Sequence, residues 1–286
     1  MSRIVYVNGD YLPEEEAKIS VFDRGFLFSD GVYEVTSVAR GKMIDNDRHM
    51  VRLERSLKEL SMELPASLED IAVIQKEVIS RNKFDEGMLY LQVTRGAAKR
   101  TFLQPKGITP SLVIFTQDMC ILDCPDTDVG ISVVTLPDIR WQRRDIKTVS
   151  LVAQSMVKQA AVDAGADDAW MVEDGFITEG SSNNVYIVTD DGTIVTRPVS
   201  NSILNGITRR AVLELARREN LKIEERAFTP EEAEEAREAF STAATHPVMP
   251  VVRINGRILN NGVPGPIGQS LVKLYREMAL ESIGEA

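Results

Sequence analysis

Alternating apolar and polar residues run through the first part of the chain and predict antiparallel hairpins. The stretches IVYVNGDYL (4–12) and YEVTSVARGKMI (33–44) each alternate around an Asn-Gly or Arg-Gly dipeptide that suits a tight turn. In DRHMVRLERSLKELSM (47–62) apolar residues recur at helical spacing, and residues 67–81 predict a second helix. Further strands are predicted at 88–96 and 111–116. Residues 1–119 are therefore expected to form a small domain that mixes strands and helices.

A polar stretch with proline and glycine, CILDCPDTDVG (120–130), is the best candidate for a linker between two domains. Beyond it, short apolar runs predict strands at 131–136, 168–172, 184–189, 193–197 and 221–226. Periodicity and capping signals predict helices at about 150–164, 208–219, 229–239 and 267–281. VVRINGRIL (251–259) predicts another hairpin. Residues 131–286 are thus expected to form a larger second domain, and the fold class is α+β.

The composition narrows the class of protein. The chain has 286 residues, 43% of them hydrophobic, which is enough for two packed domains. Its formal net charge of −10 argues against a nucleic-acid partner, because such proteins need a basic face. No apolar run approaches the roughly 18 residues that cross a bilayer, and the start of the chain lacks the build of a signal peptide. We therefore expect a cytoplasmic protein with no nucleic-acid or membrane partner.

Few residues are available for metal-dependent or hydrolytic chemistry. Cys120 and Cys124 are the only cysteines, and His49 and His246 are the only histidines. They are too few for a disulfide framework or a His-rich zinc site, so we expect no metal, and a Cys-His or Ser-His hydrolase has few candidate residues. The absence of a G-x-G-x-x-G or Walker-type loop in the sequence also removes the main support for nucleotide binding.

Lys147 stands out within DIRWQRRDIKTVS (138–150), between an extended stretch and the start of a predicted helix. Taken alone, it could be an ordinary solvated lysine. A cation near a helix N-terminus opposes the helix dipole, however, so an uncharged or covalently bound amine suits this position better. We expect Lys147 to lie at the end of a strand.

Three later segments contain residue types that suit an anionic ligand. ITEGSSNNVYIV (177–188) places one carboxylate, Glu179, in a run that could also form a simple turn. ILNGITRRAVLEL (203–215) begins a helix whose first amides could bind a phosphate, although an ordinary capped helix begins in the same way. FSTAATHPVMPV (240–251) offers small and hydroxyl residues where further backbone amides could approach an anion.

These segments, preceded by DRGFLFSDGVYEV (23–35) and HMVRLERS (49–56), follow an order that resembles the fold-type IV pyridoxal-phosphate aminotransferases. That family includes D-amino-acid, branched-chain and (R)-amine transaminases, and the resemblance extends from Asp23 to Pro250. It implies a small mixed α/β lobe and a larger lobe with a mostly antiparallel, barrel-like sheet and helices. It also implies pyridoxal 5'-phosphate as the cofactor and at least a homodimer.

The resemblance assigns a role to each motif. Lys147 becomes the Schiff-base lysine and acid/base catalyst, which must be neutral to attack the cofactor aldehyde. Glu179 becomes the partner of the pyridine nitrogen, which it keeps protonated so that the ring withdraws electrons. Arg52 anchors the phosphate, and Tyr33 reaches the substrate. The other implied cofactor contacts are Leu204 against the ring and the phosphate-binding residues Ile207, Thr208, Ala244 and Thr245.

The stretch MLYLQVTRGAAKRTFLQP (88–105) bears on the substrate. It resembles a segment that in D-amino-acid transaminases holds the substrate carboxylate with an arginine and a histidine. Arg100 matches the arginine, whereas Phe102 stands where the histidine would be, which weakens the carboxylate site. A mobile surface charge is the plain alternative for Arg100. We expect an aminotransferase that moves the amino group of a D-amino acid to 2-oxoglutarate or pyruvate.

Several alternatives stay open at this point. Branched-chain L-amino-acid and (R)-amine transaminases are close to the leading interpretation, and aminodeoxychorismate lyase, which eliminates pyruvate, is a more distant one. A catalytically silent dimeric binding protein with the same fold is the alternative from another class. Lys147 and Glu179 argue against it, because a protein that only binds would not need them.

Overall fold

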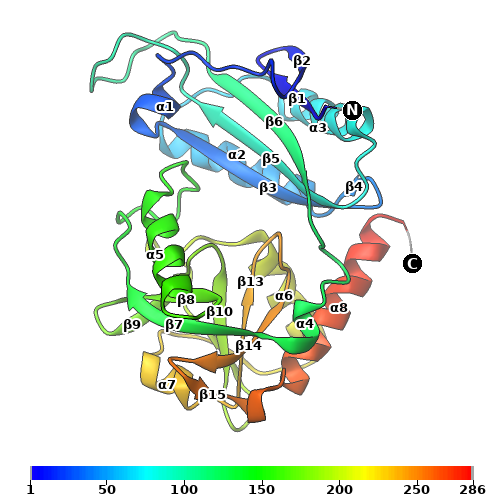
Figure 1. Cartoon of the computed structure of the whole chain (residues 1–286), viewed down its shortest axis with the longest axis vertical. Coiled ribbons are helices and arrows are strands. Elements are labelled where there is room, and N and C mark those ends of the chain that lie inside the picture. The colour runs from blue at the N-terminus through cyan, green and yellow to red at the C-terminus, as the bar shows by residue number, and fades with distance from the viewer. Residues whose placement is uncertain (1, 285–286) are drawn as a thin grey trace. The chain divides into compact units, whose positions relative to one another are not determined.

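The structure is a computed structural model that describes residues 2–284 of the chain. It divides into two compact units (Figure 1). The first contains the residues up to Ile121 together with Ile146–Ser150, and the second contains Leu122–Asp145 together with the described residues from Leu151 onward. The short segment with Lys147 is thus part of the first unit, although the chain on either side of it belongs to the second.

The first unit contains a six-stranded antiparallel sheet with the order β2-β1-β6-β5-β3-β4. Its strands are β1 (Ile4–Val7), β2 (Asp10–Pro13), β3 (Gly31–Ala39), β4 (Lys42–Met43), β5 (Gly87–Thr94) and β6 (Ser111–Asp118). The turns that join β1 to β2 and β3 to β4 are Asn8-Gly9 and Arg40-Gly41, and all four residues have positive φ. Both predicted hairpins are therefore present.

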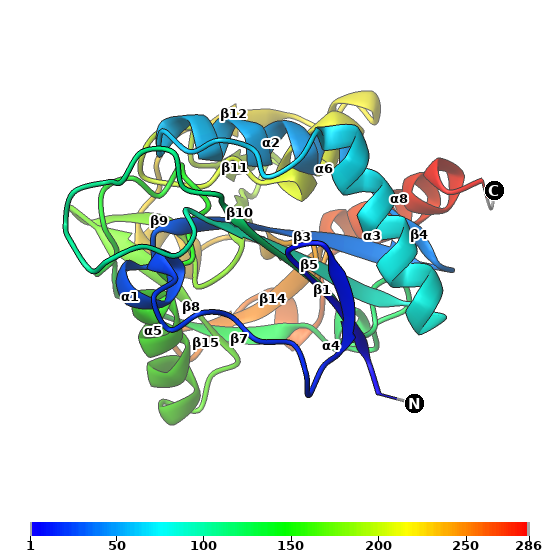
Figure 2. The same cartoon turned by 90° about the horizontal axis from the view of Figure 1, so that it is seen from above.

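Two helices, α2 (Asn46–Glu59) and α3 (Leu68–Asn82), pack on this sheet (Figure 2). α2 contacts β3, and α3 contacts β1 and β6. The helical spacing of apolar residues predicts the buried stripe on α2, where Leu53 and Leu57 are fully buried. These side chains share one hydrophobic core with Leu89 of the sheet. The chain pattern and the packing therefore agree in this unit.

The second unit is built on a nine-stranded sheet with the order β12-β11-β10-β13-β14-β7-β8-β9, and β15 also pairs with β14. Its strands are β7 (Ile131–Pro137), β8 (Asp168–Glu173), β9 (Phe176–Gly180), β10 (Asn184–Val188), β11 (Ile194–Thr196), β12 (Ile223–Glu225), β13 (Glu238–Thr242), β14 (Met249–Ile254) and β15 (Arg257–Ile258). The pairs β11–β12, β14–β7 and β7–β8 are parallel, and the other five are antiparallel. The sheet curls into a half-barrel (Figure 1), which confirms the expected mostly antiparallel, barrel-like sheet.

Helices cover parts of this second sheet. α5 (Val152–Asp163) packs on β8 and β7, while α6 (Ile207–Arg218) and α8 (Pro266–Ser282) contact each other and β13. The shorter helical segments are α4 (Asp126–Val129), α7 (Pro230–Glu234) and a 3-10 turn at Asn260–Gly262. The predicted Thr229 cap of α7 is present as a capping box with Glu232.

Four elements differ from the sequence pattern. The helix predicted over 229–239 ends at Glu234, because β13 begins at Glu238 and buries all its side chains between β10 and β14. Burial in a sheet here outweighs the helix propensity of a glutamate- and alanine-rich run. The short α1 (Arg24–Phe28) and α4 have too few residues to show a periodicity, and β9 lies in a stretch that composition alone assigns to a turn.

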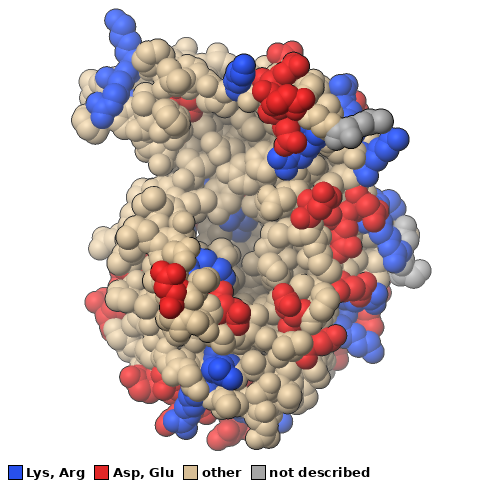
Figure 3. All heavy atoms as spheres, in the orientation of Figure 1, with Lys and Arg blue, Asp and Glu red and all other residues tan. Residues whose placement is uncertain are grey.

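The described surface carries both signs of charge. On the face drawn in Figure 3, lysine and arginine side chains are interspersed with aspartate and glutamate over each unit. This view shows no continuous basic face over the described residues. None of the helices within residues 2–284 is long and apolar enough to span a lipid bilayer.

Candidate active site

Lys147 and Tyr33 lie together in the first unit, at the start of β3. The Lys147 carbonyl accepts a hydrogen bond of 3.0 Å from the Tyr33 amide, and the Val149 amide donates to the Gly31 carbonyl at 3.1 Å. The Lys147 Nζ lies 4.1 Å from the centroid of the Tyr33 ring, within the range of a cation–π contact. The structure therefore brings the predicted catalytic amine beside one predicted substrate residue.

The expected surroundings of Lys147 need correction. β7 ends at Pro137 and α5 begins at Val152, so Lys147 lies neither at a strand end nor beside a helix N-terminus. The helix dipole acts mainly over the first turn and therefore has little effect at Lys147. The segment is held instead by its pairing with β3, where Thr148 forms a bridge with Val32.

Arg52, on α2, belongs to a buried charged cluster that the sequence pattern did not reveal. Its Nε and Nη2 donate to the Glu34 carboxylate at 2.8 and 2.7 Å, and His49 Nδ1 lies 2.7 Å from the same carboxylate. Burial would raise the pKa of Glu34, but the charge and hydrogen bonds of Arg52, with the His49 contact, lower it to about 2. Burial lowers the pKa of His49, so its ring is neutral near pH 7. A sequence signal existed, because Glu34 is the lone charge in the apolar strand GVYEV.

Arg100 lies in the long loop between β5 and β6 and is exposed. Its guanidinium carbon is 5.3 Å from the ring centroid of Phe28 and 5.7 Å from that of Phe102. Arg100 thus contacts the phenylalanine that replaces the family's histidine. Its contact with a substrate carboxylate stays a prediction.

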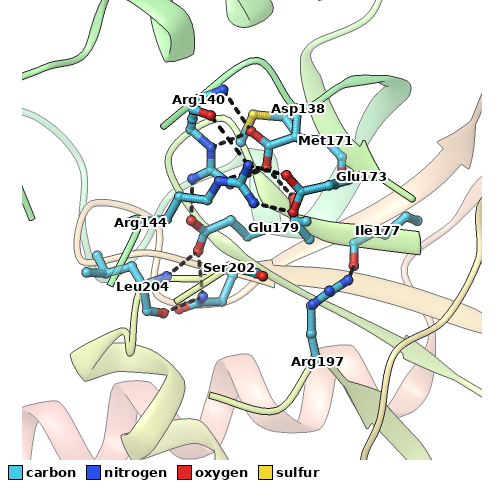
Figure 4. Close-up of polar contacts among 12 residues, drawn as sticks. Asp138, Arg140, Arg144, Met171, Glu173, Ile177, Glu179, Arg197, Ser202 and Leu204 are labelled. Carbon is cyan, nitrogen blue, oxygen red and sulfur yellow. Dashed lines mark hydrogen bonds and ion pairs between the residues drawn. The ribbon is translucent and has the colours of Figure 1, made fainter. Parts of the chain in front are cut away.

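Glu179 is a buried carboxylate near the end of β9 in the second unit, and three groups donate to it (Figure 4). Arg140 Nη1 pairs with Oε1, and Asn184 Nδ2 and the Leu204 amide donate to Oε2 at 3.0 and 2.9 Å. Burial raises the pKa of Glu179, and the charge of Arg140 and the Leu204 amide oppose that rise. Two predicted cofactor residues, Glu179 and Leu204, are therefore in contact.

Arg140 lies between two carboxylates, as Figure 4 shows. Its Nε and Nη2 donate to Asp138 at 3.0 and 2.7 Å, and the Thr178 hydroxyl donates to Asp138 at 2.7 Å. A second arginine, Arg144, makes two hydrogen bonds of 2.7 and 2.6 Å to Glu173, and its Nε lies 3.5 Å from Asp138. No motif in the sequence identifies this network. Its signal is the run DIRWQRRD, in which opposite charges crowd directly after a strand.

Hydrogen bonds also fix the turn that follows Glu179. The Asp168 carboxylate accepts from the Ser181 hydroxyl at 2.5 Å and from the Asn183 side chain at 2.7 Å. The Gly180 amide donates to the Asn183 carbonyl at 2.8 Å. The stretch ITEGSSNN is therefore a strand followed by a tight turn, and the strand positions Glu179.

Ile207 and Thr208 occupy the start of α6, whose first amides have no side-chain cap. The N-cap residue is Gly206, and the first turn contains no acidic residue. A Cβ at Gly206 would lie 2.2 Å from the Asn184 Oδ1, so glycine is required beside the side chain that contacts Glu179. A helix start of this kind suits an anion such as a phosphate.

Ala244 and Thr245 lie in the turn between β13 and β14, which the Ala243 amide closes by donating to the His246 carbonyl at 3.0 Å. The second unit thus provides helix-start amides and one buried carboxylate, and the first unit provides an amine and a guanidinium. The residue types found in each unit are those that bind a phosphorylated pyridine aldehyde, which needs an amine for its aldehyde, an anion for its ring nitrogen and cationic or amide groups for its phosphate.

Residues 31–254 match the family described as amino-transferase class IV. Because this match covers most of the chain, the protein belongs to the class IV aminotransferases. Membership confirms the resemblance, the fold-type IV architecture and the expected aminotransferase activity with pyridoxal 5'-phosphate as the cofactor.

Relatives along the whole chain give the same picture. The D-alanine aminotransferase of Bacillus licheniformis is 38% identical over 269 residues, which are 93% of this chain and 94% of that protein. The D-alanine aminotransferase of Staphylococcus aureus (strain N315) is 35% identical over 271 residues with the same coverage.

Solved structures show a similar fold. The branched-chain amino acid aminotransferase of Escherichia coli has a TM-score of 0.92 at 21% identity, over 100% of this chain and 96% of that chain. The branched-chain aminotransferase of the archaeon Thermoproteus uzoniensis, solved with norvaline, has a TM-score of 0.87 at 26% identity with the same coverage. The first of these supports the fold alone.

Proposed function

We propose that this protein transfers the amino group of a D-amino acid to a 2-oxo acid, pyruvate or 2-oxoglutarate. The observation that carries the proposal is the buried Glu179 carboxylate, held by Arg140 and Leu204 in a chain of the class IV family. The D-alanine aminotransferases, at 35 to 38% identity, support a D-amino acid as the donor. The branched-chain enzymes share the fold at 21 to 26% identity, so a branched L-amino acid is a weaker candidate.

Lys147 and Glu179 have the central roles. The bound cofactor supplies the electron sink for the charge that develops at the substrate α-carbon. Lys147 would hold the cofactor through its amine, and the same amine would take up and return the proton of the substrate α-carbon. Glu179 keeps a proton on the pyridine nitrogen. Tyr33, whose ring the Lys147 amine contacts, borders the substrate.

Arg52 anchors the cofactor phosphate in this proposal. Its bidentate pairing with Glu34 fixes the plane of the guanidinium, which supports binding of an oxyanion in one orientation. The first amides of α6 complete the phosphate site from a helix start without a side-chain cap. The remaining proposed cofactor contacts are Leu204 against the ring and Ile207, Thr208, Ala244 and Thr245 around the phosphate.

Arg100 binds the substrate α-carboxylate in the leading proposal. Phe102 offers no hydrogen bond, so the carboxylate has one partner fewer than in the family pattern. This observation favours (R)-amine transamination as a second candidate, because an amine without a carboxylate does not need the missing histidine. Aminodeoxychorismate lyase is a third candidate, and release of pyruvate from that substrate would identify it.

A substrate panel tests the reaction. We expect the loaded protein to be yellow and the colour to bleach with D-alanine more than with a branched L-amino acid or (R)-1-phenylethylamine. Preference for the L-amino acid would contradict the proposal. A protein that stays colourless after addition of pyridoxal 5'-phosphate would point instead to a binding protein without activity.

Lys147→Ala tests the catalytic residue. We expect the variant to lose turnover and the covalent cofactor while its circular dichroism spectrum stays unchanged. Lys58→Ala is the control, because Lys58 is a 71% exposed lysine of the same unit, and it should behave like the wild type. Wild-type activity in Lys147→Ala would show that another group performs the proton transfer.

A homodimer in the cytoplasm completes the proposal. Several large apolar side chains of the first unit are exposed in the single chain, with Phe102 at 84%, Leu103 at 79% and Phe26 at 75%. Exposed apolar groups of this kind support a surface that a second subunit covers. Light scattering coupled to gel filtration should give twice the 31.8 kDa mass of the chain, and cell fractionation tests the compartment.

A further inference from the structure

The charged network around Glu179 places two buried carboxylates on one guanidinium group. Arg144 pairs with Glu173, on which the charge of Arg197 also acts, whereas Arg140 pairs with both Asp138 and Glu179. The side chains of Asp138, Arg140, Arg144 and Glu179 are each at most 6% exposed, and Glu173 is 30% exposed. In the most buried part of this network, Asp138 and Glu179 share the guanidinium of Arg140.

A buried carboxylate that has only part of a guanidinium is unfavourable, and its charge can be compensated in two ways. Either one carboxylate takes up a proton, or a cation binds beside it. Glu179 is the member of the network that the proposed function places against the pyridine nitrogen, so a protonated ring would supply the missing positive charge. The single proton shared by Glu179 and the ring can then lie on either partner.

The contacts of Arg140 favour one of these two positions of the proton, the Glu179 carboxylate or the ring nitrogen. Its Nη1 pairs directly with Glu179, which stabilises the carboxylate relative to the carboxylic acid. Asp138 holds the other edge of the guanidinium through Nε and Nη2, so Arg140 cannot turn away. The Thr178 hydroxyl in turn fixes Asp138. Without Arg140, the shared proton would be more stable on Glu179.

We propose that Arg140, fixed by Asp138, is a positioning residue that keeps Glu179 ionised and so places the shared proton on the pyridine nitrogen. The inference rests on the proposed function, because it assumes that Glu179 contacts the ring nitrogen. Arg140 touches neither substrate nor ring in this proposal. It acts through Glu179 alone.

The test reads the position of the proton directly. Wild type and Arg140→Gln are loaded with pyridoxal 5'-phosphate labelled with ¹⁵N in the ring, and the ¹⁵N chemical shift is followed from pH 6 to pH 9. We expect a pyridinium shift in the wild type and a shift toward neutral pyridine in Arg140→Gln. Arg140→Lys keeps the charge and should restore most of the pyridinium signal.

Arg143→Gln is the matched control. Arg143 lies three residues further along the same segment and pairs with Asp145, but its side chain is 38% exposed. This variant should keep the wild-type ¹⁵N shift. If Arg140→Gln does not fold, Arg140→Met, which has a similar length and no charge, gives the same measurement. An unchanged pyridinium signal in the folded, uncharged variant would overturn the inference.

The affinities of the protein for two cofactor compounds distinguish a positioning role of Arg140 from a purely structural one. A cofactor analogue with a carbon in place of the ring nitrogen cannot share the proton, so Arg140→Gln should leave its dissociation constant unchanged while weakening pyridoxal 5'-phosphate about tenfold. Equal losses for both compounds would show that Arg140 only supports the fold, and would overturn the inference. A wild type that binds no pyridoxal 5'-phosphate, or holds it with a neutral ring, would refute the proposed function itself.

Discussion

The two units each bury a glutamate beside an arginine, yet the two carboxylates differ in proton affinity. In the first unit Arg52 directs two N–H groups to Glu34, and the pKa of Glu34 falls to about 2. In the second unit Arg140 directs two N–H groups to Asp138 and one to Glu179, and the pKa of Glu179 is raised. Both glutamates are at most 5% exposed, so burial alone does not explain the difference.

A carboxylate that shares a guanidinium with a second carboxylate is thus stabilised less by it, and burial still raises the pKa of Glu179. Glu34 has the bidentate partner that a fully ionised group requires, which suits a fixed structural pair. Glu179 has part of one guanidinium, an amide side chain and a backbone amide, which suits a group that is completed by a further cation. We therefore expect the Glu34–Arg52 pair to affect mainly the free energy of unfolding, and the contacts of Glu179 to affect mainly turnover.

Replacement of Glu34 should have the largest effect. Glu34→Gln leaves the buried guanidinium of Arg52 without its charged partner, and the free energy of unfolding should fall by about 3 to 5 kcal/mol. Glu77→Gln, which removes an exposed pair with Arg81 on α3, should cost about 0.5 kcal/mol or less. Urea unfolding monitored by circular dichroism measures both. Equal small losses would mean that the pair with Arg52 contributes little.

The pH dependence of that loss follows from the sign of the Glu34 shift. The folded pKa is lowered from 4.5 to about 2, so the stabilisation is fully present above pH 4.5 and is lost as the pH falls toward 2. The difference in unfolding free energy between wild type and Glu34→Gln should shrink by about 1.4 kcal/mol for each pH unit below 4.5. Parallel curves for the two proteins in this range would contradict the assignment.

The contribution of Glu179 to stability should depend on pH with the opposite sign to that of Glu34. Its folded pKa is raised, so its contribution to stability is fully present below the unfolded pKa and is lost as the pH rises through the folded value. In the cofactor-free protein, Glu179→Gln should therefore gain stability relative to wild type as the pH increases from 4 to 8. The same urea experiments provide the test, and a gain with decreasing pH would contradict the raised pKa of Glu179 in the cofactor-free protein.

Glu179→Gln should reduce turnover while leaving the fold intact. A neutral amide cannot hold the ring proton electrostatically, so kcat should drop by about 10²-fold, the scale of removing one preorganised electrostatic group. The phosphate contacts are untouched, and the variant should still bind the cofactor. Glu219→Gln, an exposed glutamate at the end of α6, is the control and should keep wild-type turnover. Full activity in Glu179→Gln would assign the proton to another group.

Local patterns in the sequence predict much of the fold. The two hairpins and helices α2 and α3 follow from alternation and from helical spacing, because neighbouring residues alone decide those features. β13 does not follow, since the predicted helix over 229–239 includes its first two residues, and only its neighbours β10 and β14 make them part of a strand. The motif order also leads to Lys147 and Glu179.

The charged partners of the candidate site residues could not be predicted. Arg140 meets Glu179 across 39 positions of the chain, and Arg52 meets Glu34 across 18, so each pair depends on how separate elements pack. A charge in an apolar strand indicates that a partner exists, but it does not say which residue it is. The neighbourhood of Lys147 was wrongly predicted for the same reason, because its pairing with β3 joins distant parts of the chain.

Replacement of Arg100 should have the smallest effect. Unlike Arg52 and Arg140, Arg100 is exposed, and its guanidinium lies over the rings of Phe28 and Phe102. If Arg100 binds the substrate carboxylate, Arg100→Ala should lower kcat/KM for D-alanine roughly 30-fold, which corresponds to a loss of about 2 kcal/mol of transition-state stabilisation. (R)-1-phenylethylamine has no carboxylate, so its kcat/KM should be unchanged or improved. Lys99→Ala, the exposed neighbour, should affect neither substrate. Equal losses for both substrates would show that Arg100 supports the loop through its ring contacts and does not select the substrate.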